Sequence, residues 1–422
     1  MLLKIVRWMF LVYVVSIPLV QPLNFYLFGL QLQPADLIFA ATFAIAAAGV
    51  VFGKFPLVWN RQYIVFGLYG AAFFVSMLFS GDSLRSLEKL AGVFYLVAIA
   101  VLTINLALDR QYPKRIIVAI VVGTALTAVA ALSGVALFYA GFDSSETNFL
   151  LSHLGSLPSG NYPRVQALFA NANMMCNFLN VGLIAILIAR RSEWIGPRIA
   201  TVLITATWIA VIFTLSPGIG GVILSAGLWY FFVHRTASPQ RRSMVLAGAV
   251  FAALFFLSAS IVSLDTPNTD RDLDIPVLNV RIEPSVRVLV WRDAISNFSR
   301  SPIIGNGAGT DAALVTYTTL SGKSQILRDA HNMWLNVAAQ TGLVGILMLA
   351  LLTISTWSLC CSGTNNDDTN IILNGFCCMF VGAFVYQGLT GSFEDARHIW
   401  LILGLIAAVA LGREPARNEL IP

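Results

Sequence analysis

The stretch Ile116–Tyr139, IIVAIVVGTALTAVAALSGVALFY, contains 24 consecutive residues without a charged side chain. An α-helix rises about 1.5 Å per residue, so a run of this length can cross the roughly 30 Å hydrocarbon core of a bilayer. Lys114 and Arg115 directly precede it, and cationic side chains are frequent at the cytoplasmic ends of transmembrane helices. The stretch therefore predicts a helix that spans a membrane.

Eleven further apolar runs give the chain its overall class. They are Trp8–Val20, Leu37–Phe52, Ile64–Phe79, Leu90–Leu108, Met174–Ala189, Ile199–Leu215, Pro217–Val233, Met244–Leu264, Trp334–Leu359, Ile371–Leu389 and Ile399–Leu411. The 422 residues are 57% hydrophobic and only 11% charged, whereas soluble domains are about 25% charged. We therefore expect an all-α polytopic membrane protein with about twelve transmembrane helices, forming a single domain over residues 1–422.

The basic residues predict how the chain is oriented. With the N-terminus placed in the cytoplasm, 15 of the 26 Lys and Arg residues fall on the cytoplasmic side, and seven of the other eleven lie in one long outer segment. This distribution follows the positive-inside rule and predicts cytoplasmic N- and C-termini. No nucleic-acid partner is expected, because proteins that bind nucleic acid concentrate their basic residues in a stripe on a soluble module.

The long outer segment, residues 265–332, carries most of the polar groups that could do chemistry. Within it Val288, Trp291, Ile295 and Phe298 recur at helical spacing, which predicts an amphipathic helix on the membrane surface. Ser285 is expected to cap that helix. At the end of the segment, Asp329 is expected to cap a helix that begins near Ala330. That helix would hold His331 and Asn332 in its first turn.

His331 is the strongest candidate for a catalytic group. The positive end of a helix dipole would lower the pKa of a histidine in the first turn and favour the neutral imidazole. A neutral imidazole can act as a general base toward a hydroxyl group. The alternative is an interfacial histidine that only forms hydrogen bonds with its own loop. His153, His234 and His398 show no organised polar neighbourhood in the sequence and are weaker candidates.

Three arginines on the predicted outer face could bind an anion. Arg164, Arg287 and Arg397 come from three different loops beside predicted spans, and a guanidinium group can pair with two phosphate oxygens at once. The alternatives are snorkelling to lipid headgroups and ion pairs with Glu394 and Asp395.

The remaining polar and cysteine motifs favour structural roles. The Gly305-x-Gly307-x-Gly309 run resembles a phosphate-binding nest, but a tight turn is preferred because no strand is predicted before it. Asn171 and Asn173 could bind sugar or cap a helix, and capping is preferred. The five cysteines, which all lie in or beside apolar runs, are expected to be packing residues and not to form disulfides. They are Cys176, Cys360, Cys361, Cys377 and Cys378.

A transporter is the main rival class of function. Coupled transporters usually place ionisable groups near the middle of the membrane. Here all 21 acidic residues fall in loops or at the ends of the apolar runs. A polysaccharide or lipid transporter is therefore less favoured than an enzyme with a site on the outer face.

An ordered series of motifs resembles the O-antigen ligase and O-antigen polymerase superfamily. The series is Arg287-x-x-x-Trp291, Pro302-x-x-Gly305-x-Gly307-x-Gly309, His331-Asn332 and Gly342-x-x-Gly345. The resemblance is densest between residues 287 and 345 and extends loosely over the chain through the Arg164…Asn173 pair. Two positions depart from the pattern. Pro217 stands in a Ser-Pro-Gly turn where many members carry arginine, and Gln340 stands where an acidic residue is common.

The resemblance implies a GT-C-type glycosyltransferase in the bacterial inner (plasma) membrane. It implies transfer of a glycan from undecaprenyl diphosphate, on the periplasmic face, to an acceptor hydroxyl. A ligase would use lipid A–core as acceptor, and this is preferred over an O-antigen or exopolysaccharide polymerase, which would use a second lipid-linked glycan. Neither a metal nor another cofactor is expected. By analogy His331 would activate the acceptor and Arg287 would help hold the diphosphate, and further substrate contacts would come from Arg164, Arg397, Asn332, Asn173 and Trp291.

Overall fold

The computed structural model describes most of the chain. It covers residues 1–27, 30–55, 57–109, 111–142, 149–153, 163–234, 236–258, 262–263, 273–275, 280–284, 286–318, 324–362, 367–391 and 396–411. Ser285, Glu394 and Asp395 lie outside these ranges, as does most of the polar stretch before residue 273.

Helices dominate the described residues. They are α1 (Leu2–Ser16), α2 (Pro34–Val51), α3 (Gln62–Met77), α4 (Ser83–Ala107), α5 (Tyr112–Tyr139), α6 (Ala172–Arg191), α7 (Pro197–Phe213), α8 (Ile219–Val233), α9 (Pro239–Ser258), α10 (Val286–Arg300), α11 (Met333–Cys361), α12 (Asp367–Thr390) and α13 (Arg397–Leu411). Each of the twelve apolar runs overlaps one of these helices. The remaining helix, α10, is the amphipathic helix predicted in the long outer segment.

Seven described helices are long and apolar enough to cross a membrane. They are α2, α4, α5, α6, α9, α11 and residues Thr369–Gly388 of α12. Shorter apolar helices are α3, α7, α8 and residues Arg397–Ala410 of α13. The chain is therefore a membrane protein with transmembrane helices. The total of about twelve spans and the side on which each terminus lies remain predictions.

Short strands, which the all-α expectation omitted, occur only between the helices of the described chain. They are β1 (Phe25–Leu27), β2 (Leu30–Leu32), β3 (Leu151–His153), β4 (Pro163–Val165), β5 (Val262–Ser263), β6 (Leu273–Ile275), β7 (Val280–Pro284), β8 (Val315–Thr318) and β9 (Ser324–Leu327). The β3–β4 pairing sets Arg164 opposite Ser152. These pairings are too short to give a clear alternating pattern in the sequence, and they serve to hold loops at the ends of helices.

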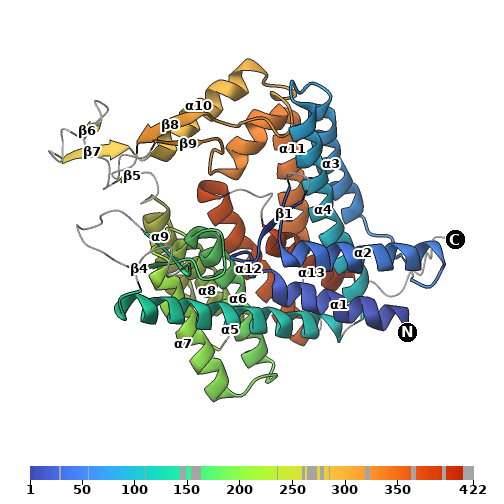
Figure 1. Cartoon of the computed structure of the whole chain (residues 1–422). Helices are drawn as coiled ribbons and strands as arrows, with labels where there is room; N and C mark the ends of the chain where they lie inside the picture. The colour runs from blue at the N-terminus through green and yellow to red at the C-terminus, as the bar shows by residue number, and fades with distance from the viewer. Residues whose placement is uncertain are drawn as a thin grey trace.

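The helices form two neighbouring groups (Figure 1). One group contains α3, α4, α11 and α13, and α10 packs across the end of α11. The other group surrounds α6, which contacts α5, α7, α8 and α12. Helix α6 is the most buried candidate span and α9 the most exposed. Helices α12 and α13 contact each other and join the two groups.

Helix α11 does not begin where the sequence suggested. It starts at Met333, and Asn332 is its N-cap, since the Asn332 side chain accepts a hydrogen bond from the Leu335 N–H at 3.1 Å. The prediction that His331 and Asn332 lie in the first helical turn was wrong. The asparagine side chain competes with the helical backbone for hydrogen bonds and so favours the cap position. Asp329 instead organises the loop that precedes the helix.

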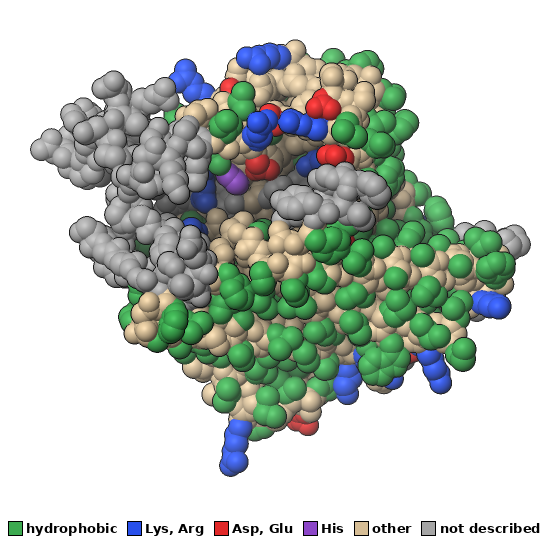
Figure 2. Space-filling view, in the orientation of Figure 1, with side chains coloured by type: hydrophobic (Ala, Val, Ile, Leu, Met, Phe, Trp, Pro, Cys, Tyr) green, Lys and Arg blue, Asp and Glu red, His purple; other side chains and the backbone are tan. Residues whose placement is uncertain are grey.

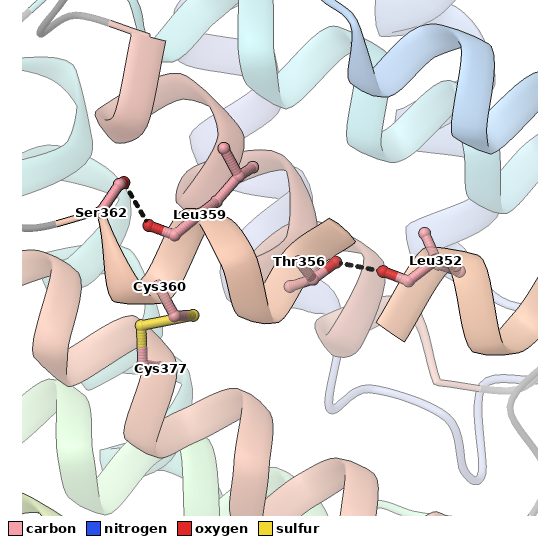
Figure 3. The surroundings of a disulfide bond; sticks show 6 residues. All are labelled: Leu352, Thr356, Leu359, Cys360, Ser362 and Cys377. Atoms are coloured by element: carbon pink, nitrogen blue, oxygen red, sulfur yellow. Dashed lines mark hydrogen bonds between the residues drawn. A yellow bond between two sulfur atoms is a disulfide. The ribbon is translucent and has the colours of Figure 1, made fainter. Parts of the chain in front are cut away.

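The cysteine expectation was wrong for one pair. Cys360 of α11 and Cys377 of α12 form a disulfide, with their Cα atoms 5.8 Å apart (Figure 3). Residues 362–366 connect the two helices, so the end of α11 lies beside the first part of α12, and helical spacing alone does not show which side chains then face each other. Cys176 and Cys378 are buried, as expected of packing residues, whereas Cys361 is exposed.

Candidate active site

His331 lies on a loop that hydrogen bonds hold in one conformation. Asp329 Oδ1 accepts from the His331 N–H at 2.5 Å, and Asp329 Oδ2 accepts from Asn336 Nδ2 at 2.7 Å. Asn336 Oδ1 accepts from the Ala330 N–H at 2.8 Å. His331 has φ +46°, a left-handed conformation that residues other than glycine adopt rarely. Strain of this kind persists where the surrounding structure fixes it, often at functional sites.

The surroundings of His331 favour its neutral form. Burial lowers the pKa of His331, the nearby Asp329 carboxylate raises it, and the positive charge of Arg287 lowers it further, with a net downward shift. The imidazole Nδ1 lies 3.6 Å from Asp329 Oδ1, and 41% of the side chain remains exposed. The direction agrees with the sequence-based expectation, but the main cause is burial and not a position inside the first turn of a helix.

Arg164 lies against the turn in which Pro217 replaces the expected arginine. Its Nε donates to the Thr214 carbonyl oxygen at 3.1 Å, and its Nη2 donates to Asn173 Oδ1 at 3.1 Å. The same Asn173 oxygen accepts from Ser216 Oγ at 2.9 Å. Strand β4 thus brings a guanidinium group to the turn from another part of the chain.

Arg287 influences the ionisation of both Arg164 and His331. Burial lowers the pKa of Arg287, and the hydroxyl of Tyr386 partly offsets that effect. Burial also lowers the pKa of Arg164, with Tyr386 raising it and Arg287 lowering it. Arg287 lowers the pKa of both Arg164 and His331, so side chains from β4, α10 and the loop before α11 influence one another's ionisation.

A pocket of about 210 Å³ opens beside this group. Its polar wall is made by Asn171, Asn173, Asp329, His331, Tyr386, Gln387, Arg397 and His398, and its apolar wall includes Ile17, Val20, Phe169 and Met174. Figure 2 shows a hollow with a histidine at its wall and both basic and acidic side chains around it, above a broad hydrophobic surface. His398 shows no organised neighbourhood in the sequence, but the structure places it in this wall.

Arg397 lines the pocket as half of an ion pair. Its Nε and Nη2 donate to the two carboxylate oxygens of Asp36 at 3.0 and 3.1 Å. Tyr95 donates its hydroxyl to the same carboxylate at 2.8 Å. The pair joins the start of α13 to the start of α2, so the charge of Arg397 is already compensated within the protein. Glu394 and Asp395, the ion-pair partners predicted from the sequence, lie outside the described residues.

Two residues predicted to contact substrate hold the loop that carries His331 and do not line the described pocket. Trp291 Nε1 donates to the Ala330 carbonyl oxygen at 3.0 Å, and Asn332 caps α11. Both therefore position His331. Asn171 also caps a helix, since its Oδ1 accepts from the Met174 N–H at 2.9 Å, whereas Asn173 contacts Arg164 and lines the pocket.

The glycine-rich turn is a packing element and not a phosphate nest. Gly305, Gly307 and Gly309 all have positive φ angles, and the N–H groups of Asn306, Gly307 and Gly309 donate to α11. Those of Gly307 and Gly309 donate to the backbone oxygen and to Oε1 of Gln340, at 3.1 and 3.0 Å. The turn docks where α11 is kinked at Gly342, which has φ +65°. Gln340 stands where an acidic residue is common in the superfamily, and here its neutral amide provides the oxygen that accepts from Gly309.

Tyr386 is a part of the site that the sequence did not reveal. It lines the pocket and influences the pKa values of both Arg164 and Arg287. A tyrosine near the end of an apolar run has no distinctive signal, because such residues are common where helices meet the membrane surface.

The comparison with family models matches part of the chain. Residues 199–350 match the family model described as O-Antigen ligase. No curated protein shows a significant match to the chain. The matched range contains Arg287, Trp291, the glycine-rich turn and His331, while Arg164 and Arg397 lie outside it. Residues 199–350 are therefore similar to the O-antigen ligase family, which confirms the predicted resemblance over that part of the chain.

Proposed function

We propose that this protein transfers a glycan from undecaprenyl diphosphate to an acceptor hydroxyl on the periplasmic face of a bacterial inner membrane. The observation that carries the proposal is the pocket that His331 lines together with Asn173, whose side-chain oxygen accepts a hydrogen bond from Arg164 at 3.1 Å. A base and a pair of cations at one site suit a reaction that removes a proton and releases an anion.

The cations suit the leaving group. Arg287 disfavours the charge on Arg164, so an anion bound near both guanidinium groups would relieve that repulsion. Guanidinium groups bind phosphate oxygens in a bidentate manner. When the bond between the sugar C1 and the diphosphate oxygen breaks, its electrons pass to the diphosphate. Fixed cations that face this developing charge lower the barrier.

The histidine suits the acceptor. As the acceptor oxygen attacks C1, its proton passes to the neutral imidazole of His331. Asp329, with Oδ1 3.6 Å from Nδ1, then stabilises the imidazolium ion. This assignment requires only side chains of the described chain to move the proton and bind the leaving group, and it uses no metal.

Lipid A–core is the preferred acceptor, which makes the protein a ligase of lipopolysaccharide biosynthesis with a GT-C architecture. A deletion strain distinguishes the two members of the superfamily. Polymer that stays on its lipid carrier indicates a ligase, whereas glycans of a single repeat indicate a polymerase.

Transfer in vitro from a purified lipid-diphosphate glycan to defined acceptors tests the proposal. His331→Ala should lower kcat by roughly 10²- to 10⁴-fold, the usual effect of removing a general base. His234→Ala is the matched control, because His234 lies at the end of α8 and stacks on Tyr230. Full activity in His331→Ala, or no transfer by the native protein to any acceptor, would overturn the assignment.

A further inference from the structure

We infer that a groove between α1 and α5 binds an anionic phospholipid, distinct from any donor held near His331. The groove has a volume of about 610 Å³. Its lining includes Trp8, Leu11 and Val15 from α1 and Lys114, Arg115 and Val118 from α5. This inference does not depend on the proposed function.

The two helices run side by side in the same direction. At one end the Tyr112 hydroxyl of α5 donates to the Arg7 carbonyl oxygen of α1 at 2.7 Å. Further along, a Cβ atom at Gly123 of α5 would lie 3.5 Å from the Val15 carbonyl oxygen of α1. The two helices that form the walls of the groove are therefore parallel along its length.

Polar and apolar groups are sorted along the groove. Lys114 and Arg115 lie in the first turn of α5, level with Trp8 of α1, and Leu11, Val15 and Val118 follow. A phospholipid has the same order, with a charged headgroup at one end and acyl chains beyond it. Tryptophan, lysine and arginine are typical of the headgroup level of a membrane, and leucine and valine suit the acyl chains.

The headgroup end favours a negative charge. Lys114 and Arg115 add two cations to the positive end of the α5 dipole, and no acidic side chain is among the described residues that line the groove. The nearby Asp109 already pairs with Arg7 at 2.9 Å. Arg115 is exposed, and Trp8 is 67% exposed, so a lipid can reach this end from the bilayer.

The headgroup end of the groove, at Lys114 and Arg115, lies far from Arg164 of the candidate active site. Helix α5 has 28 residues and is therefore about 40 Å long. Near the far end of α5, Gly134 packs against Leu150. Leu150 directly precedes β3, which pairs with β4, the strand that carries Arg164. A diphosphate held by Arg164 cannot also occupy the groove, so the occupant is a second lipid.

Native mass spectrometry of the purified full-length chain, titrated with phosphatidylglycerol or phosphatidylcholine, tests the inference. Phosphatidylglycerol should bind more tightly, and Lys114→Gln/Arg115→Gln should weaken it roughly tenfold or more, since each basic residue near an anionic headgroup favours binding. The charge-conserving Lys114→Arg/Arg115→Lys should restore binding. Lys54→Gln/Arg61→Gln, which removes two exposed basic residues outside the groove, is the matched control and should have no effect.

Three outcomes would overturn the inference. They are equal binding of the two lipids, equal loss in the control variant, and displacement of the lipid by soluble glycerol phosphate, which would show a simple anion site. The single variant Arg115→Gln changes an exposed side chain and keeps the test decisive if the double variant fails to fold. That variant should still weaken phosphatidylglycerol binding severalfold, and unchanged binding would also contradict the inference.

Discussion

The indole Nε1 of Trp291 donates a hydrogen bond to the carbonyl oxygen of Ala330 at 3.0 Å, directly before His331 in the chain. Helix α10 therefore holds the loop that carries the candidate base. Ala330 is fully buried and packs in a small cluster with Val290 and Ala294 of the same helix. The amphipathic helix thus supports the loop that carries His331.

Trp291→Phe should lower kcat roughly 2- to 10-fold and leave the KM for the donor unchanged. Phenylalanine keeps an aromatic ring in the cluster but cannot donate the hydrogen bond, which contributes about 0.5–1.5 kcal/mol. Steady-state kinetics with a purified lipid-linked donor provide the measurement. A raised donor KM with unchanged kcat would instead show that Trp291 contacts the donor, as the motif resemblance alone implied.

The pH dependence of transfer should report the lowered pKa of His331. The base is active when neutral, so the rate should stay constant as pH falls to the ordinary histidine pKa of about 6.5 and decline only below it. Asp329 raises the pKa of His331, so Asp329→Asn should move this decline to still lower pH. Profiles of kcat/KM provide the measurement, with Asp311→Asn as the control. A decline that moves to higher pH in Asp329→Asn would exclude His331 as the titrating group.

Arg287→Gln should impair use of the donor more than use of the acceptor. Hydrogen bonds to charged groups contribute about 1.5–3 kcal/mol, so kcat/KM for the donor should fall roughly 10- to 150-fold. Arg292→Gln is the matched control, because Arg292 is an exposed arginine on the same helix. Arg164→Gln combined with Arg287→Gln should show a loss smaller than the product of the single losses, since both side chains would bind one anion. Equal impairment for donor and acceptor would identify a structural arginine.

The sequence predicts helices well here because the apolar runs that lipid requires are long and carry few charges. It also predicts that His331, Arg287 and Arg164 belong to one face, since each lies in a polar segment beside an apolar run. It does not predict contacts between distant segments. Asp36 and Arg397 are 361 positions apart, and no local pattern marks them as partners.

Local competition for hydrogen bonds explains the misplaced start of α11. Asp329 and Asn332 are both good N-cap residues, and hydrogen bonds with Asn336 decide between them. Asn336 pairs with Asp329 and Ala330, which keeps Asp329 in the loop. The pairing requires the side chain of Asn336 to face back toward the loop.

Asp36→Asn should destabilise the protein by leaving Arg397 partly buried without its counter-ion. The side chains are only 12% and 16% exposed, and breaking a buried ion pair on one side costs about 3–5 kcal/mol. A lower thermal unfolding midpoint in detergent should follow. The double variant Asp36→Asn/Arg397→Gln should recover part of the loss, because no unpaired charge remains. A double variant less stable than either single variant would show that the two side chains do not act mainly through each other.

Gly305→Ala should prevent stable folding, whereas Gly53→Ala should be tolerated. The two glycines have similar positive φ angles, +73° and +64°, so the backbone strain of an alanine is nearly the same at both, about 1–3 kcal/mol. Only the surroundings differ. A Cβ atom at Gly305 would overlap the backbone carbonyl of Gln340, while nothing lies within 4 Å of a Cβ atom at Gly53. The amounts of monodisperse protein after membrane extraction, together with the unfolding midpoints, provide the measurement. Equal effects of the two substitutions would show that φ alone matters, and that close docking of the glycine-rich turn on α11 does not hold the region around His331 together.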